Sequence, residues 1–217
     1  MSLTLHDYWR STASYRVRIA LNLKGVAYAR ATHDLRTGAQ REPGYLAIAP
    51  QGLVPALQTP EGPLTQSLAI LEWIEERWPE PALLPKDAHG RAIVRAMAGL
   101  IAADIHPLNN LRVLQALREQ FSASPDQVQA WIGRWITEGF TALERMIGAY
   151  GGAFAFGDHP TLADCALVPQ VYSAERLGVD LEPFAQLRRV NDAALALAPM
   201  AAAHPSRQPD ADADAPR

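Results

Sequence analysis

Cysteine is almost absent from this chain of 217 residues, with Cys165 as its single example. One thiol can form neither a disulfide framework nor a cysteine-based zinc site within the chain. Positive charge is not in excess either, since 20 Lys and Arg stand against 23 Asp and Glu, which argues against nucleic acid or an anionic membrane as partner. No apolar run approaches the ~18 residues that cross a bilayer, and the first ten residues lack the apolar core of a signal peptide. We therefore expect a cytoplasmic protein that binds no nucleic acid and no membrane.

Several common catalytic and nucleotide-binding motifs are also missing. The sequence contains no G-x-x-x-x-G-K-[ST], G-x-G-x-x-G, H-E-x-x-H or G-x-S-x-G, so none of these patterns assigns a phosphate loop, a zinc protease or a nucleophile elbow. What remains is an ordinary globular composition, with 48% hydrophobic and 20% charged residues. The function must be read from smaller clusters.

Residues 1–85 alternate between strand-like and helix-like segments. In the first helical segment the cations Arg16, Arg18 and Lys24 accompany apolar residues at helical spacing, which indicates an amphipathic helix that stops at Gly25. In the second helical segment, at 66–78, Glu75 belongs to the polar side. The order β-α-β-(α)-β-β-α is that of a small α/β domain. We expect strands at 3–8, 26–32 and 54–59, a turn at 60–63 leading to 64–65, and helices at 13–23 and 66–78.

Composition changes after the Pro79-Glu80-Pro81 segment, and the second half is all-helical. Residues 204–217 are rich in Pro, Ala and Asp without apolar periodicity, which is typical of a flexible end. We predict an α/β domain over 1–85, an all-α domain over 86–209 and a flexible tail over 210–217. The expected helices of the second domain are 88–105, 126–150, 161–177 and 184–197.

Three hydroxyls, those of Ser11, Thr12 and Ser14, gather where the first strand should pass into the first helix. Ser and Thr are preferred helix N-caps, and capping alone explains any one of them. The free N–H groups and positive end of the helix would also favour a bound anion. A ligand thiol held there would ionise more easily, although Ala13 supplies no thiol from the protein itself.

Two further clusters lie in the first domain. Val54-Pro55 stands at a strand start, where the bond can be trans or cis; a cis bond would present the N–H and C=O of Val54 to an extended peptide ligand. Gln66 and Ser67 precede a helix, where Ser67 can cap the helix, bind a ligand carboxylate, or do both.

In the second domain, Pro107 should interrupt the first helix, and His106, Asn109, Asn110 and Arg112 gather around the break. We expect no metal site, because no second His or Cys with ligand spacing is near.

Later along the chain, Thr161 and Asp164 have the spacing of a helix-start capping box. Arg176 follows Glu175 directly, and by themselves these two residues are an ordinary solvated pair of opposite charges.

In order and spacing these clusters resemble the glutathione S-transferase superfamily from Leu3 to about Pro209, and its zeta class in particular. The segment Ser11–Leu21 is similar to the zeta signature S-S-C-x-W-R-V-R-I-A-L, with Thr12, Ala13 and Tyr15 in place of its second Ser, its Cys and its Trp. Without that Cys, the protein itself supplies no thiol in this segment. The other matching segments are Val54-Pro55, Gln66-Ser67, His106–Leu111, Thr161–Asp164, Pro169–Val171 and His204–Asp210.

The resemblance implies a thioredoxin-like N-terminal domain, a helical C-terminal domain, a homodimer and glutathione as cofactor. Residues 11–16 would face the thiol of glutathione, Val54 its cysteinyl backbone, Gln66 and Ser67 its γ-glutamyl carboxylate, and Gln40 its glycyl end. Carried over by motif, the binding residues are Ser11, Thr12, Ala13, Ser14, Tyr15, Arg16, Gln40, Val54, Pro55, Gln66, Ser67, His106, Asn110, Leu111 and Arg112.

The activity implied is cis–trans isomerisation of a small maleyl dicarboxylate to its fumaryl isomer, with maleylacetoacetate of tyrosine breakdown expected first and maleylpyruvate of gentisate breakdown close behind. Ser11 would favour the thiolate, and Arg176, Arg10 and, third, Arg112 are the candidates to hold the anionic substrate. A general glutathione transferase or dehalogenase is the alternative enzyme. A non-catalytic binding module is a further alternative, which the retained hydroxyls of Ser11 and Ser14 disfavour.

Overall fold

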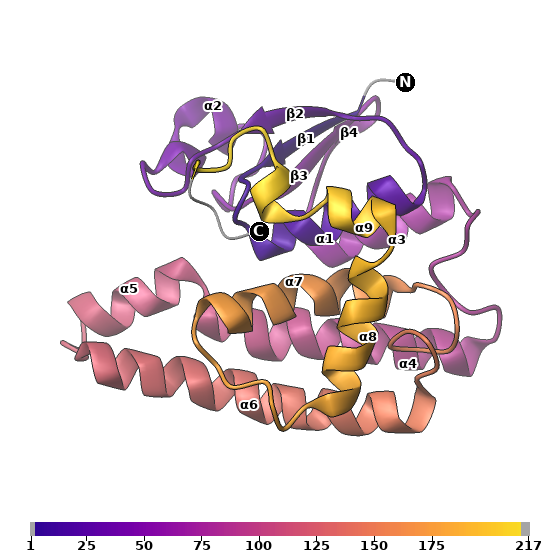
Figure 1. The fold of residues 1–217 in the computed structure, drawn as a ribbon. Coiled ribbons are helices and arrows are strands. Elements are labelled where there is room, and N and C mark those ends of the chain that lie inside the picture. The colour runs from indigo at the N-terminus through magenta and orange to yellow at the C-terminus, as the bar shows by residue number, and fades with distance from the viewer. Residues whose placement is uncertain (1–2, 214–217) are drawn as a thin grey trace. The chain divides into compact units, whose positions relative to one another are not determined.

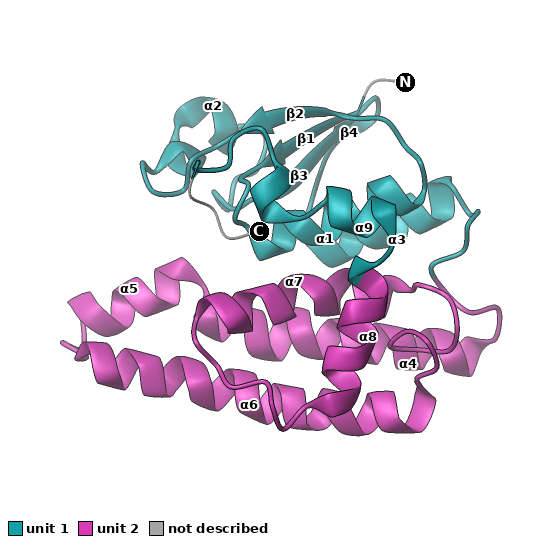
Figure 2. Ribbon diagram, viewed as in Figure 1, with its two compact units in different colours: residues 1–83, 195–217 teal, residues 84–194 magenta. Residues whose placement is uncertain are grey.

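The computed structural model describes residues 3–213, which divide into two compact units (Figure 2). Unit 1 combines the stretch up to residue 83 with the C-terminal stretch from 195, and unit 2 contains residues 84–194. The boundary that we placed after residue 85 lies two residues from this division. The C-terminal stretch differs more, because we assigned 195–209 to the helical domain and the structure groups it with the α/β unit. Residues 214–217 of the predicted tail lie outside the described residues.

Unit 1 is built on a four-stranded mixed sheet with strand order β2-β1-β3-β4 (Figure 1). Strand β1 (Thr4–Asp7) pairs in parallel with β2 (Ala29–Thr32), whereas β3 (Ala56–Thr59) is antiparallel to β1 and to β4 (Gly62–Thr65). Leu57 stands opposite both Leu5 and Leu64, which places apolar side chains together across the sheet. The expected strands are confirmed, although the segment at 26–32 is a strand only in its second half.

Two long helices, α1 (Thr12–Leu23) and α3 (Ser67–Arg77), lie along the same face of the sheet and pack on each other (Figure 1). The short helix α9 (Ala198–Ala202) packs against α1, and α2 (Pro43–Leu46) precedes β3. The sequence predicted α1 and α3. The single turns α2 and α9 are too short to produce a periodic pattern.

The polar side that we expected on α1 is not exposed, which corrects the amphipathic interpretation. Arg16, Arg18 and Lys24 are all buried, because α3 and α9 both pack against this helix. Lys24 pairs with Glu75 of α3 at 2.6 Å, so Glu75 is buried as well. Buried charges of this kind persist in pairs, since each partner replaces the water that the other has lost.

Unit 2 is all-helical, as expected. Helix α4 (Ala88–Gly99) runs into a π-helical turn (Leu100–Ile105), and a 3-10 turn (His106–Asn109) follows, so Pro107 does coincide with the break. The remaining helices are α5 (Leu111–Glu119), α6 (Pro125–Tyr150), α7 (Leu162–Arg176) and α8 (Ala185–Leu195). Helix α5 was not predicted from the sequence. Helices α4 and α7 pack together, and α6 packs against the π-helical turn.

Capping boxes begin two of these helices. The Thr161 and Asp164 box of α7 is confirmed: Asp164 Oδ2 accepts hydrogen bonds from the N–H and the hydroxyl of Thr161 at 2.8 and 2.9 Å. Its Oδ1 also accepts from the N–H of Ala155 at 2.8 Å, which fixes the preceding loop. Helix α6 has a second, exposed box made by Ser124 and Gln127.

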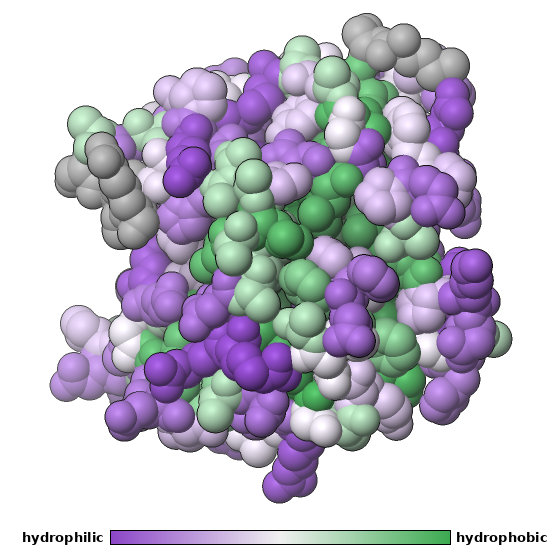
Figure 3. Space-filling model, turned by 45° about the vertical axis from the view of Figure 1, so that its right-hand side comes forward, coloured by the Kyte–Doolittle hydropathy of each residue, from purple (hydrophilic) through white to green (hydrophobic). Residues whose placement is uncertain are grey.

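Hydrophilic and hydrophobic residues are interspersed on the face shown in Figure 3. Among the described residues, the large hydrophobic side chains that are exposed are Leu111, Phe121 and Tyr150. Within residues 3–213, none of the helices combines the length and the apolar character required of a membrane span.

Candidate functional site

The passage from β1 into α1 holds the first candidate cluster. Ser11 is the N-cap of α1, and its Oγ accepts a hydrogen bond from the N–H of Ser14 at 3.2 Å. Its own N–H donates to the carbonyl of Tyr8 at 2.9 Å. Ser11 is partly exposed, whereas Thr12 and Ser14 are buried. Of the three hydroxyls, that of Ser11 is therefore the most accessible to a ligand at the positive end of the helix.

The neighbours of Ser11 complete this cluster. The guanidinium of Arg10 lies over the ring of Trp9, 5.4 Å from its centroid, and Arg10 is partly exposed. Ala13 is partly exposed on the first turn of α1, and Tyr15 is fully buried. Ala13 has no polar side-chain group, so Ser11 and Arg10 are the polar residues of this cluster that are partly exposed.

The start of α3 forms a second cluster, which the fold connects to α1. Arg16 donates from Nη1 to Oγ of Ser67 at 3.1 Å, a buried hydrogen bond between residues 51 apart in sequence. Desolvation lowers the pKa of Arg16 to about 10, so the group remains cationic at neutral pH. Gln66, in the left-handed region at φ 70°, donates from its amide to Oε1 of Gln51 at 2.6 Å. A cation, a hydroxyl and a helix N-terminus together suit a carboxylate.

The loop before β3 contains Val54-Pro55, whose peptide bond is cis. Just upstream, Tyr45 donates from its hydroxyl to the carbonyl of Leu53 at 2.6 Å. Gly52 has φ +61°, and a Cβ there would stand 3.0 Å from the carbonyl oxygen of Gln40. The 3-10 turn that carries Gln40 is therefore packed closely against this loop.

Two histidines that no sequence motif singles out, His6 and His33, lie beside that loop. His6 Nδ1 and His33 Nε2 share a hydrogen bond of 2.9 Å, and the ring of His33 lies 4.2 Å from that of Tyr45. Burial lowers the pKa of both histidines, and the charge of His33 lowers that of His6 further.

The second unit carries the remaining predicted residues. His106 begins the 3-10 turn, and Asn110 caps α5 by accepting from the N–H of Arg112 at 3.2 Å. Leu111 and Arg112 are exposed on the first turn of α5, and Arg176 is exposed on the last turn of α7. Within residues 3–213 we find no group of three or more His, Cys, Asp and Glu placed to hold a metal ion.

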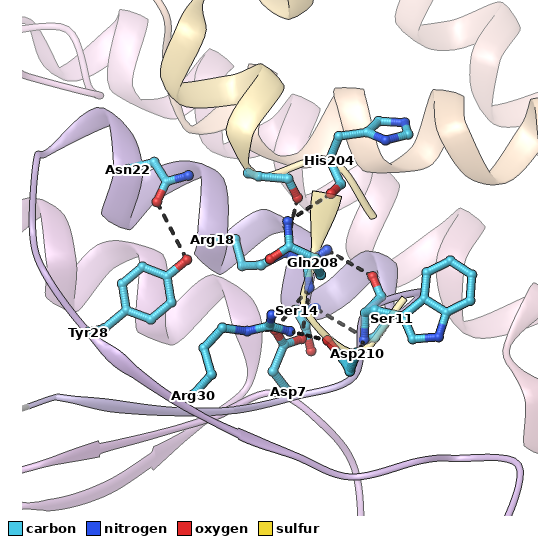
Figure 4. A network of polar contacts seen from close by, with 12 residues as sticks. Asp7, Ser11, Ser14, Arg18, Asn22, Tyr28, Arg30, His204, Gln208 and Asp210 are labelled. Carbon is cyan, nitrogen blue, oxygen red and sulfur yellow. Dashed lines mark hydrogen bonds and ion pairs between the residues drawn. The ribbon is translucent and has the colours of Figure 1, made fainter. Parts of the chain in front are cut away.

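A set of charged residues beneath the Ser11 cluster escaped the sequence analysis. Asp7 and Arg18 are fully buried and paired at 2.8 Å, and Arg30 joins them from β2 (Figure 4). The signal was present as two cations and an acid in apolar segments. Helical periodicity assigns Arg18 to a polar helix face and says nothing of Asp7 and Arg30, because pairing between separate segments leaves no periodic signal.

Comparison with known proteins places this fold and site in a family. The model of the glutathione S-transferase N-terminal domain matches residues 10–77, and that of the C-terminal domain matches residues 125–196. The chain belongs to the glutathione S-transferase family.

Individual relatives narrow the class. The chain is 51% identical over 214 residues to maleylacetoacetate isomerase of Pseudomonas aeruginosa, which covers 97% of this chain and 100% of the relative. It is 48% identical over 210 residues to maleylpyruvate isomerase of a Ralstonia species, covering 96% and 99%. A glutathione S-transferase described as zeta class, from Euphorbia esula, is 43% identical and covers 96% of this chain and 92% of the relative.

Solved structures that are similar to this chain indicate the same class. A holo structure of maleylpyruvate isomerase, described as a bacterial zeta-class glutathione S-transferase, superposes with a TM-score of 0.94 at 48% identity over 98% of this chain and 100% of the other. Maleylacetoacetate isomerase of Anaeromyxobacter dehalogenans, solved with glutathione in its active site, gives a TM-score of 0.89 at 48% identity over 97% and 98%. The zeta-class resemblance inferred from the sequence is thereby confirmed.

Proposed function

We propose that the protein is a glutathione-dependent cis–trans isomerase that converts a maleyl dicarboxylate to its fumaryl isomer, with maleylacetoacetate as the expected substrate. The observation that carries this proposal is full-length similarity near 50% identity to proteins named for that reaction. The reaction belongs to the breakdown of tyrosine and phenylalanine. The family resemblance also supports a homodimer in the cytoplasm.

The residues of unit 1 fit glutathione. The γ-glutamyl end carries a carboxylate, and the start of α3 offers the hydroxyl of Ser67, the buried cation of Arg16 and the side chain of Gln66. By family resemblance, the backbone of Val54 pairs with the cysteinyl unit and Gln40 lies near the glycyl end. The thiol then belongs beside residues 11–16, where the helix N-terminus and the Ser11 hydroxyl are found.

Ser11 and the N-terminus of α1 act on the charge of the thiol. A hydroxyl that donates to sulfur and the partial positive charge of a helix end both favour the thiolate over the thiol. When bound, glutathione supplies a thiolate that can add reversibly to the alkene carbon, which allows rotation about the former double bond. Ser11 therefore lowers the free energy of the reactive ionisation state without taking a proton from the substrate.

Cationic side chains recognise the substrate in this proposal. A maleyl dicarboxylate carries two negative charges, and charge develops on its carbonyl oxygen as the thiolate adds, so arginine is the suitable partner. Arg176 is our first candidate and Arg10 the second, and both are accessible enough to meet a ligand. His106 and the stretch 110–112 would line the substrate side.

Maleylpyruvate is the alternative substrate, favoured by the 48% identity and TM-score of 0.94 to a maleylpyruvate isomerase. Both compounds have a maleyl unit and two carboxylates, so the features of the site that we describe fit either one. A general transferase differs in consuming glutathione, and a dehalogenase in displacing halide from its substrate.

The decisive experiment follows both compounds spectrophotometrically with and without glutathione, and measures total glutathione by thiol titration at the end. The isomerase hypothesis predicts turnover that requires glutathione and leaves its amount unchanged. Loss of glutathione in proportion to product would favour a transferase, and no turnover of either compound would reject the proposal. The ratio of kcat/KM between the two compounds identifies the substrate.

A further inference from the structure

The peptide groups of Trp9, two residues before Ser11, are held on both sides by charged side chains. The N–H of Trp9 donates to Oδ2 of Asp210 at 2.9 Å, and its carbonyl accepts from Nη2 of Arg18 at 3.0 Å. Hydrogen bonds to ionised groups are stronger than neutral ones. The backbone that leads into the Ser11 cluster is therefore tightly oriented.

These two contacts are the ends of one closed ring. Asp210 Oδ1 pairs with Arg30 at 2.8 Å, Arg30 pairs with Asp7 Oδ2 at 2.6 Å, and Asp7 Oδ1 pairs with Arg18 at 2.8 Å. The path returns through Arg18 to Trp9. Opposite charges alternate from Asp210 to Arg18, so Arg30 and Asp7 each have a partner of opposite sign on either side. The neutral peptide groups of Trp9 close the ring between Arg18 and Asp210.

Asp210 balances the charge of this ring. Without it, Asp7 alone would face two guanidinium groups in a site where Asp7 and Arg18 are 0% exposed and the Arg30 side chain is 15% exposed. An excess charge in such a place is costly. Because Asp210 is 19% exposed, its side chain can be changed without opening the core.

The segment that carries Asp210 is attached by other contacts as well. Gln208 donates from its amide to the carbonyls of Ala202 and His204 at 3.1 and 2.7 Å. Ala211 packs against the apolar cluster that contains Trp9. Asp210 and Ala211, at the start of the tail that we expected to be flexible, therefore make defined contacts. A substitution at Asp210 thus tests the carboxylate rather than the attachment of the segment.

We propose that Asp210 is a positioning residue: its carboxylate fixes the backbone of Trp9 and thereby sets the hydroxyl of Ser11 for its action on the glutathione thiol. The link is short, because the N–H of Ser11 closes a turn onto the carbonyl of Tyr8 that spans Trp9. This proposal rests on the proposed function and adds to it a residue some two hundred positions away in sequence.

The test compares Asp210→Ala with Asp212→Ala in the full chain. Asp212 lies two residues further along and pairs with the exposed Arg36, so its variant loses the same charge from the same segment without touching Trp9. Two readouts are needed: the exchange rate of the Trp9 amide by NMR without ligand, and the thiol pKa of bound glutathione by absorbance titration. Kd for glutathione and kcat are measured alongside.

We expect Asp210→Ala to exchange the Trp9 amide at least about tenfold faster, to raise the thiol pKa by about 1 and to lower kcat about tenfold, with Kd within about twofold. Asp212→Ala should match the parent. Unchanged exchange in Asp210→Ala would overturn the proposal, and so would faster exchange with the parent's thiol pKa, which would leave Asp210 a purely structural role.

If Asp210→Ala fails to fold, Asp210→Asn replaces it, since an amide still accepts from Trp9 while losing the charge toward Arg30. In Asp210→Asn we expect smaller increases in the exchange rate of the Trp9 amide and in the thiol pKa of bound glutathione. Parental values of both quantities would reject the proposal. A parent that binds no glutathione would refute the proposed function instead, and the Trp9 exchange would then decide alone whether Asp210 holds this loop.

Discussion

Arg16 donates from Nη1 to the hydroxyl oxygen of Ser67 across 3.1 Å, and both side chains are buried. The contact joins the second turn of α1 to the first turn of α3, the two helices whose N-termini define the candidate glutathione site. A cation placed at one helix start thus orients the hydroxyl at the other.

Replacing Arg16 with Met should weaken glutathione binding about tenfold, close to 1.4 kcal/mol, because Ser67 loses its donor and the carboxylate site loses a charge. Isothermal titration calorimetry measures this directly. Arg77→Met, which removes an exposed cation from the last turn of α3, is the matched control and should keep the parent's Kd. Equal Kd values in all three proteins would disprove the assignment.

Removing the Ser11 hydroxyl should raise the thiol pKa of bound glutathione and slow turnover roughly 10- to 100-fold, the effect of about 1.5–3 kcal/mol for one hydrogen bond to a charged group. Ser11 is also the N-cap of α1, so Ala costs stability as well. Gly is tolerated at N-caps, and Ser11→Gly separates the two effects: it should unfold much like the parent yet lose the same activity. A parental thiol pKa in both variants would move the role to another residue.

Arg176→Ala should raise KM for the dicarboxylate about tenfold or more while leaving Kd for glutathione nearly unchanged, because a charge-assisted contact to a carboxylate is lost. Steady-state kinetics and calorimetry give the two values. Arg188→Ala, an exposed arginine on α8, controls for the change in net charge. A similar loss of affinity for the dicarboxylate and for glutathione would indicate that Arg176 has a structural role.

The two capping boxes should differ in their contribution to stability. Asp164→Ala leaves the N–H groups of Ala155 and Thr161 without an acceptor in a buried site, so we expect a loss of about 3 kcal/mol or more in the free energy of unfolding. Ser124→Ala removes an exposed cap and should cost about 1 kcal/mol. Urea denaturation gives both values, and similar losses would contradict the role assigned to burial.

Stability should fall as pH drops below about 6.5. Burial lowers the pKa of His6 and His33 from 6.5, so the unfolded chain binds more protons just below that pH, and the free energy of unfolding rises with pH through the window. The pKa of Asp164, raised by burial to about 6, acts in the opposite direction. Urea melts from pH 5 to 7.5 of the parent and His33→Gln isolate the contribution of His33, because the Asp164 contribution cancels in the difference.

The difference in unfolding free energy between parent and His33→Gln should therefore depend on pH below 6.5 and level off above it. His89→Gln, at an exposed position on α4, controls for the change of residue type. Parallel curves for parent and His33→Gln would show that His33 does not titrate in this range.

Local signals predicted much of this structure. Hydroxyls before apolar periodicity placed one helix cap among Ser11, Thr12 and Ser14 and another at Thr161, and Pro107 marked the break after α4. These predictions succeeded because caps and prolines act through the backbone of their own turn.

What failed depended on contacts between distant segments. Arg18 has the sequence pattern of a surface cation, and it is buried because Asp7 and the carbonyl of Ala203 happen to meet it. Asp210 has the sequence pattern of a polar tail, although it contacts Arg30 and Trp9, which lie far away in the sequence. Pairing partners separated by up to two hundred residues leave no periodic trace, so burial of charge could not be anticipated.

The division of the chain bears on the order in which it folds during synthesis. Unit 2 is one continuous stretch, whereas unit 1 needs residues beyond 194 to supply α9 and Asp210. During synthesis every strand of the sheet therefore leaves the ribosome long before α9 is available to pack against α1. The helical unit lies later in the sequence, yet all its residues leave the ribosome before unit 1 is complete. A chaperone that binds nascent chains would therefore meet an α/β unit in which Arg18 still lacks the carbonyl of Ala203.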